Sequence, residues 1–264
     1  MDPSVVCKST LPVQYDAADA IKRIGLLALA TDLTIERDFA RIIPPDRAGV
    51  YATRVAYENP TTLENLRRMV PRLTAATELI LPGETLDVVC YGCTAASVVI
   101  GDDEIAAAVH VAKPGVPVVT PTGAARMAFA ALGVTRIAVL TPYLIETSRP
   151  MAAYFTRHGF EVTRLECFGL EDDRAMARVC REIIVDAACR VDRPEAEAVF
   201  VSCTALPAVT AIAEIEARTG KPVVTSNQAS AWQMMRHAGL DDRPQGFGRL
   251  FDLGLPRSDN GRVA

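Results

Sequence analysis

Two stretches of the chain, residues 87–95 (DVVCYGCTA) and residues 197–205 (EAVFVSCTA), share one pattern. In each stretch, an apolar run typical of a buried strand leads to a cysteine that is followed by Thr-Ala. Two further segments recur around them in the same order: residues 23–27 resemble residues 136–140, and residues 117–120 resemble residues 222–225. Repetition on this scale predicts two halves of similar fold.

Apolar runs alternate with helical patterns along the whole chain. Strands are predicted over residues 24–29, 88–91, 118–120, 137–140, 198–201 and 223–225. Helices are predicted over residues 61–73, 102–111, 123–132, 150–158, 172–191, 206–219 and 229–238. This alternation is typical of an α/β fold whose parallel sheets are covered on both faces. We therefore predict two pseudo-symmetric flavodoxin-like lobes, with the active site in the cleft between them.

The repeat also suggests how the chain divides between the lobes. The first lobe is predicted to contain residues 1–118 together with residues 224–264, and the second lobe residues 119–223. In this division the last strand and helix, over residues 223–238, cross back to complete the first lobe. Ligands of open parallel sheets bind beyond the carboxyl ends of the strands, so two facing lobes would share one site.

Composition excludes several classes of function. The chain has 264 residues, a formal net charge of -4 and interspersed acids and bases. It lacks the basic patch that nucleic acids or anionic membranes require, and no apolar run reaches the roughly 18 residues of a membrane span. The first 16 residues do not resemble a signal peptide. We therefore expect a cytoplasmic protein that binds a small molecule, with neither nucleic acid nor membrane as a partner.

The cysteines do not fit a disulfide framework or a metal site. There are seven of them, an odd number, and only three histidines. Cys90 and Cys93 form a single C-x-x-C motif, but no second pair follows that could complete a zinc site. A thioredoxin-type motif is also a poor match, because Cys90 falls within a predicted strand. We expect neither a metal nor another cofactor.

Cys93 and Cys203 occupy equivalent positions in the repeat, each just after a strand and before a helix. A thiol there points into the predicted cleft, and the first N–H groups of a helix can lower its pKa. The N–H groups of Thr94, Ala95, Thr204 and Ala205 could also bind a substrate carboxylate. Two facing thiols suit two-base racemisation or addition to a double bond, with one sulfur as base or nucleophile and the other as acid.

The alternative is that these cysteines are small core residues, as most buried cysteines are. Their equivalence within the repeat favours a catalytic role. The other cysteines have no repeat partner and are interpreted as structural: Cys7, Cys90, Cys167, Cys180 and Cys189.

Further polar residues follow the other predicted strands. Asp32 comes after the first strand, Thr120 after the third and Tyr143 after the fourth. Tyr143 could donate a hydrogen bond to a substrate carboxylate or could simply pack as an aromatic side chain. Threonine at the end of a strand often caps the following helix, so Thr120 has that alternative role.

These motifs resemble the aspartate/glutamate racemase superfamily, and within it the maleate cis–trans isomerase and arylmalonate decarboxylase branch. The resemblance extends from residue 23 to about residue 253 and includes residues 30–38 (ATDLTIERD) and 246–251 (GFGRLF). It implies two pseudo-symmetric lobes and no cofactor, and members often form dimers. In maleate isomerases the first cysteine, here Cys93, is the attacking thiolate and the second, here Cys203, is the acid. Arylmalonate decarboxylases keep only the second cysteine, so the presence of both cysteines in this chain favours isomerisation or racemisation.

Two departures from the maleate isomerases concern the substrate. Those enzymes bind their dicarboxylate with two asparagines, whereas the matching positions here are Asp32 and, most plausibly, Asp173. Two acids beside a dianion would weaken binding, whereas a substrate with an ammonium or amidinium group would pair with them. The surrounding residues resemble a member associated with ectoine utilisation, whose intermediates carry such cations. A decarboxylase and a non-catalytic binding protein remain alternatives.

Overall fold

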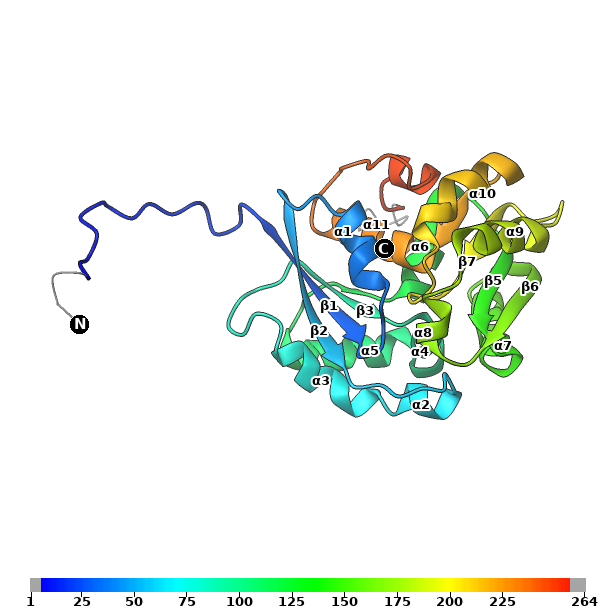
Figure 1. The fold of residues 1–264 in the computed structure, drawn as a ribbon, viewed down its shortest axis with the longest axis horizontal. Coiled ribbons are helices and arrows are strands. Elements are labelled where there is room, and N and C mark those ends of the chain that lie inside the picture. Colours follow the sequence, from blue (N-terminus) through cyan, green and yellow to red (C-terminus); the bar gives the residue numbers. More distant parts are fainter. Residues whose placement is uncertain (1–5, 257–264) are drawn as a thin grey trace.

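The computed structural model describes residues 6–256 and contains two four-stranded parallel sheets (Figure 1). The first sheet has the order β2-β1-β3-β4 and the second the order β6-β5-β7-β8, so the two halves have the same topology. The first sheet is formed by β1 (Lys22–Leu29), β2 (Ala48–Val55), β3 (Val88–Gly92) and β4 (Val118–Val119). The second sheet is formed by β5 (Arg136–Tyr143), β6 (Glu161–Leu170), β7 (Ala198–Val201) and β8 (Val223–Thr225). The prediction of two pseudo-symmetric α/β lobes with parallel sheets is confirmed.

The six predicted strands are all present, and the structure adds β2 and β6 at the outer edges of the two sheets. The central strands β3 and β7 are buried at every position, as their continuous apolar runs require. In contrast, β2 and β6 are partly exposed and include Arg54, Arg164 and Glu166. These two edge strands lack the apolar run from which the other six strands were predicted, so they were missed.

Helices cover the sheets and differ from the prediction mainly at their boundaries. They are α1 (Ile35–Ile42), α2 (Leu63–Arg67), α3 (Val70–Glu78), α4 (Thr94–Ile100), α5 (Asp102–Ala112), α6 (Pro121–Leu132), α7 (Ile145–Arg157), α8 (Asp173–Met176), α9 (Arg181–Val191), α10 (Ile212–Thr219) and α11 (Ser226–His237). The helices predicted over residues 61–73 and 172–191 are each split in two. The helix α1 was not predicted, and α4 was expected after Cys93 without bounds. Short 3-10 helices span Val209–Ala211 and Arg249–Asp252.

The final strand corrects the predicted division of the chain. β8 pairs with β7 in the second sheet, so residues 223–225 do not cross back to the first lobe. The helix that follows does cross, because α11 packs against α6, α1 and β3. This places the first turn of α11 beside the carboxyl ends of strands from both sheets.

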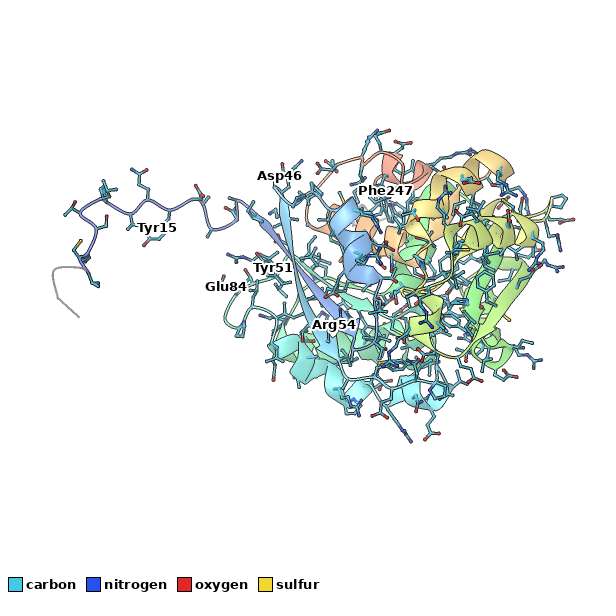
Figure 2. All side chains as sticks on the ribbon, in the orientation of Figure 1. Tyr15, Asp46, Tyr51, Arg54, Glu84 and Phe247 are labelled. Carbon is cyan, nitrogen blue, oxygen red and sulfur yellow. The ribbon has the colours of Figure 1, made fainter. Side chains whose placement is uncertain are left out.

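Residues 6–21 extend away from the two sheets (Figure 1). Tyr15 lies on this segment and is 88% exposed (Figure 2). Among the described residues, no helix combines the length and apolar character needed to cross a membrane.

Candidate active site

The two repeated cysteines line one small pocket between the lobes. Cys93 follows β3 and is the N-cap of α4, while Cys203 follows β7, and each is only 6% exposed. The pocket is lined by side chains of both lobes. Its lining contains every predicted site residue except Thr120: Asp32, Cys93, Thr94, Ala95, Tyr143, Asp173, Cys203, Thr204 and Ala205.

Thr120 has a structural role instead. It is the N-cap of α6, where its Oγ1 accepts a hydrogen bond from the Gly123 N–H (3.1 Å) and donates one to Asp102 (2.5 Å). Thr120 therefore lies outside the pocket and has the capping role that was its alternative. The α6 helix begins at Pro121, which leaves the cap as the role for the preceding threonine.

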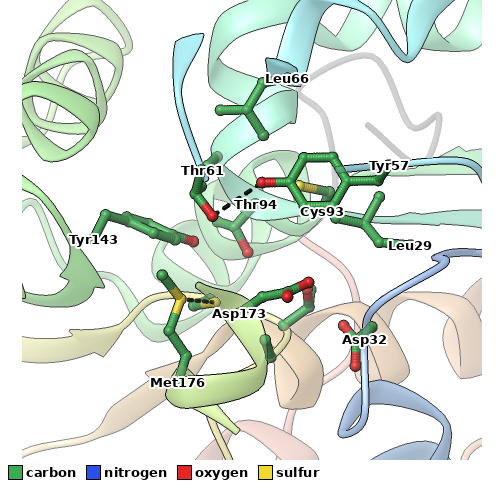
Figure 3. Close-up of a pocket in the computed structure, with 14 residues that line it drawn as sticks. Leu29, Asp32, Tyr57, Thr61, Leu66, Cys93, Thr94, Tyr143, Asp173 and Met176 are labelled. Atoms are coloured by element: carbon green, nitrogen blue, oxygen red, sulfur yellow. Dashed lines mark hydrogen bonds between the residues drawn. The ribbon is translucent and has the colours of Figure 1, made fainter. Parts of the chain in front are cut away.

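Five further residues line the pocket and were not predicted: Leu29, Tyr57, Thr61, Leu66 and Met176. Tyr57 and Thr61 follow the edge strand β2 and are joined by a hydrogen bond of 2.9 Å (Figure 3). Met176 ends α8, and its sulfur lies 3.9 Å from the sulfur of Cys203. Most of these residues follow β2 or β6, so they could have been found only by recognising the edge strands.

Asp32 presents a free carboxylate oxygen to the site. Its Oδ1 accepts hydrogen bonds from the N–H groups of Thr34 (2.7 Å) and Ile35 (2.9 Å), while its buried Oδ2 has no partner among residues 6–256. Burial raises the pKa of Asp32, although those two N–H groups and the neighbouring Thr204 hydroxyl lower it. A buried carboxylate oxygen without a partner is costly, so this atom is suited to a ligand that donates a hydrogen bond.

Asp173 is already fully bonded, unlike Asp32. Its Oδ1 accepts from Asn59 Nδ2 (2.7 Å), its Oδ2 accepts from the Thr31 hydroxyl, and its N–H donates to Asn59 Oδ1 (3.2 Å). Asp173 thus joins the segment after β2 to the start of α8 across the pocket. Both acids were predicted to bind the substrate, but only Asp32 has a buried carboxylate oxygen without a partner among the described residues.

The hydroxyls of Thr94 and Thr204 connect the two cysteine turns. Thr94 Oγ1 donates to Ser226 Oγ (2.8 Å), and Thr204 Oγ1 donates to the Gly92 carbonyl oxygen (3.1 Å). Each threonine therefore lines the pocket while its hydroxyl proton is used within the protein. These bonds hold the two halves of the repeat at a fixed separation.

Burial dominates the acidity of both thiols. It raises the pKa of Cys203 to about 12, even though Tyr143 and the N–H groups of Ala205 and Leu206 favour the thiolate. It raises the pKa of Cys93 further, with only the Ala96 N–H opposing it. A helix N-terminus was expected to lower these pKa values; the N–H groups do act in that direction, but desolvation outweighs them.

Tyr143 reaches the pocket from the second lobe and is 2% exposed (Figure 3). Burial raises its pKa well above the usual range, and any negative charge on Cys203 or Cys93 raises it further. The phenol consequently stays protonated and can donate a hydrogen bond.

Among the described residues, no group of three or more potential ligands is placed to hold a metal ion.

The backbone of Cys203 is strained, whereas that of Cys93 is not. Cys203 has a φ of 100°, a region that side-chain-bearing residues rarely adopt, and Cys93 has a φ of -149°. We expect Cys203→Gly to be more stable than Cys203→Ala by about 1 kcal/mol, because only glycine relieves this strain. Urea unfolding measures the difference. At Cys93, where φ is ordinary and only the N-cap preference for glycine applies, the advantage of glycine over alanine should be smaller than at Cys203. An equal or larger advantage at Cys93 would contradict the prediction.

A family model described as arylmalonate decarboxylase matches residues 74–251. The chain is similar to an arylmalonate decarboxylase of Bordetella bronchiseptica, with 36% identity over 142 residues, which is 52% of this chain and 59% of that one. It is also similar to a maleate isomerase of Pseudomonas putida, with 25% identity over 86% of this chain and 96% of that one.

One solved structure shows the same fold over most of the chain. It is the maleate cis–trans isomerase of Nocardia farcinica, in a cysteine-to-serine mutant with a covalently bound succinylcysteine intermediate. It superimposes with a TM-score of 0.81 at 23% identity and covers 88% of this chain and 98% of its own.

Proposed function

This chain belongs to the arylmalonate decarboxylase family, and from that premise we propose that it is a cofactor-independent isomerase or racemase of a small carboxylate. The observation that carries the proposal is that Cys93 and Cys203 line one pocket from equivalent positions of the repeat. A family member that used a single thiol would need only one of them. Burial of both sulfurs in a mostly apolar pocket also excludes water from the reacting carbon.

Two reactions fit this pair of thiols. In racemisation, one thiolate removes the α-proton from one face and the opposite thiol gives its proton to the other face, which leaves the two sulfurs with exchanged roles. In cis–trans isomerisation, the thiolate adds to one carbon of a double bond while the other carbon takes the proton of the second thiol. Rotation about the new single bond, return of that proton and expulsion of the thiolate then give the other isomer. Tyr143 is placed to donate to a carboxylate oxygen as charge develops.

The free oxygen of Asp32 supports a substrate that also carries a cation. An ammonium or amidinium group donates hydrogen bonds and would satisfy the buried Oδ2, whereas a second carboxylate would be repelled by it. The size of the pocket restricts the choice to small molecules. Amino-acid-like intermediates of ectoine breakdown are such compounds, and we propose them as the first candidates.

Asp32→Asn tests this substrate class. We expect KM for a cationic amino-acid substrate to rise roughly 30-fold or more, because a buried charge pair is lost. We expect KM for dicarboxylates such as maleate to fall, since the repulsive charge is removed. Steady-state kinetics on both substrates measures the change, and Asp46→Asn, which removes an exposed acid, is the control (Figure 2). An unchanged KM for the cationic substrate would exclude this role of Asp32.

Decarboxylation is the second candidate function, because the family model and the 36% identical relative both carry that description. In that reaction carbon dioxide leaves the substrate, and one thiol, Cys203, protonates the resulting enediolate. Turnover in heavy water followed by NMR separates the candidates. Deuterium at an α-carbon without release of carbon dioxide indicates a racemase. A changed double-bond geometry indicates an isomerase, and release of carbon dioxide indicates a decarboxylase. If diaminobutyrate derivatives, aspartate, maleate and arylmalonates all gave no exchange and no turnover, the proposed function would be wrong.

A further inference from the structure

The turn that carries Cys203 is held by residues that lie outside the pocket. The Cys203 N–H donates to Ser226 Oγ (3.0 Å), and the Thr204 carbonyl oxygen accepts from Asn227 Nδ2 (2.8 Å). The Ala205 carbonyl oxygen accepts from Thr34 Oγ1 (2.7 Å). Because Cys203 has an unfavourable φ of 100°, such external bonds are what keep its backbone in place.

Asn227 is oriented so that its amide can only donate to this turn. Both of its Nδ2 hydrogens are used, one for the Thr204 carbonyl and one for Asp38 Oδ2 (2.8 Å). Its Oδ1 is buried with no partner in the part of the chain that the structure describes. A rotated amide would place Oδ1 against two acceptors, so the carbonyl and the carboxylate together determine its orientation.

Asp38 is a buried acid with no access to the pocket. It lies on α1 and is 0% exposed, and its Oδ1 accepts from Arg41 Nη1 (3.2 Å). Burial raises its pKa to about 6, while Asn227 and Arg41 lower it. Asp38 therefore faces the site only through Asn227, and no step of the proposed reaction uses it directly.

The first half of the repeat has no such arrangement. There Cys93 begins the regular helix α4, and its carbonyl oxygen accepts from both the N–H (3.0 Å) and the hydroxyl (2.7 Å) of Ser97. The residues equivalent to Ser226 and Asn227 are Pro121 and Thr122, neither of which has an amide side chain. After Cys203, by contrast, regular helix starts only with the 3-10 turn at Val209. Thr94 of the first turn donates to Ser226 of α11, but only the second turn is bonded to the amide of Asn227.

We propose that Asn227, oriented by Asp38, is a positioning residue that holds Cys203 in its strained conformation, with its sulfur facing the substrate. The inference rests on the proposed two-thiol chemistry for its kinetic consequence, but not for its structural one. Loss of the Asn227 donor frees the Thr204 carbonyl, lets the Cys203 backbone relax and moves the N–H groups of Ala205 and Leu206 away from the sulfur.

Asn227→Ala tests the proposal with two readouts. We expect kcat to fall roughly 10- to 100-fold with KM within about twofold, because Asn227 does not line the pocket. Independently of turnover, we expect the rate of alkylation of Cys203 by iodoacetamide to fall roughly tenfold relative to Cys93, as measured by peptide mass spectrometry. The Cys93 rate is the internal reference, because both thiols line one pocket.

Gln228→Ala is the matched control. Gln228 is the next residue of α11 and completes its capping box with Thr225, so its loss weakens the same helix end without touching the Cys203 turn. It should lower Tm and leave the alkylation ratio unchanged.

The exchange variant Asp38→Asn/Asn227→Asp restores a hydrogen bond between positions 38 and 227 but offers the Thr204 carbonyl a carboxylate in place of a donor. We expect it to fold and to keep the altered alkylation ratio.

A wild-type alkylation ratio in Asn227→Ala, or an altered ratio in Gln228→Ala of the same size, would overturn the proposal. A wild-type ratio in the exchange variant would overturn it as well, because pairing alone would then suffice. Should wild-type protein turn over none of the candidate substrates, the alkylation ratio still decides the role of Asn227, and only the proposed function fails.

Discussion

Replacing either Cys93 or Cys203 by alanine is expected to lower kcat for racemisation or isomerisation by at least about 10³-fold. In the proposed two-thiol chemistry each sulfur serves one face of the substrate, and no other described thiol lines the pocket. Asp32 and Asp173 are the carboxylates there, and Asp173 has both oxygens bonded to protein groups, while burial raises the pKa of the phenols of Tyr57 and Tyr143. Removing one thiol therefore leaves half of a two-step proton transfer.

Deuterium exchange gives this prediction a sharper form. With one thiol left, that sulfur can still remove and return a proton on its own face, so one enantiomer should exchange its α-hydrogen without being inverted. The two variants should retain exchange of opposite enantiomers. Cys90→Ala is the matched control, because Cys90 is a buried cysteine of β3 that does not line the pocket. Full activity in Cys93→Ala would contradict the two-thiol proposal and favour the single-thiol decarboxylase.

The central part of the fold follows from the sequence because continuous apolar runs and an internal repeat are strong signals. β3 and β7 are buried along their whole length, and the cysteines after them are correctly placed in one pocket. The edge strands β2 and β6 were missed because partly exposed strands with charged residues, such as Arg54 in β2, carry no such run. Since Tyr57 and Met176 follow these strands or the loops after them, part of the pocket was missed with them.

Hydrogen-bond partners were beyond prediction for a different reason. The sequence indicates that Asp32 and Asp173 lie near the site, but not that Thr31 and Asn59 saturate one of them. Asn59 comes from a loop more than a hundred residues away from Asp173 in the chain, and its contact depends on how the lobes meet. Likewise, the positive φ of Cys203 has no signal in its sequence, because the equivalent Cys93 is followed by the same two residues and is extended.

The second large effect concerns pH. Because burial raises the pKa of Cys203 to about 12 and that of Cys93 further, both thiols are protonated in the free protein at neutral pH. The thiolate fraction then grows about tenfold with each pH unit below the pKa, so kcat/KM for a substrate that does not titrate in this range should rise by about 10³-fold from pH 6 to pH 9. A thiol with a pKa lowered by the helix N-terminus would instead give a plateau near neutral pH.

The kcat/KM profile and the alkylation rates of the Cys93 and Cys203 peptides should rise in parallel. Glutathione alkylated under the same conditions is the reference, since an ordinary thiol with a pKa of about 8.5 levels off at alkaline pH. Asp32→Asn adds an internal check on alkylation: the Asp32 charge raises the pKa of both thiols, so its removal should displace the alkylation profiles of the Cys93 and Cys203 peptides to lower pH without changing their slope. A plateau in kcat/KM and in alkylation below about pH 8 would show that the helix N-terminus, rather than burial, governs these sulfurs.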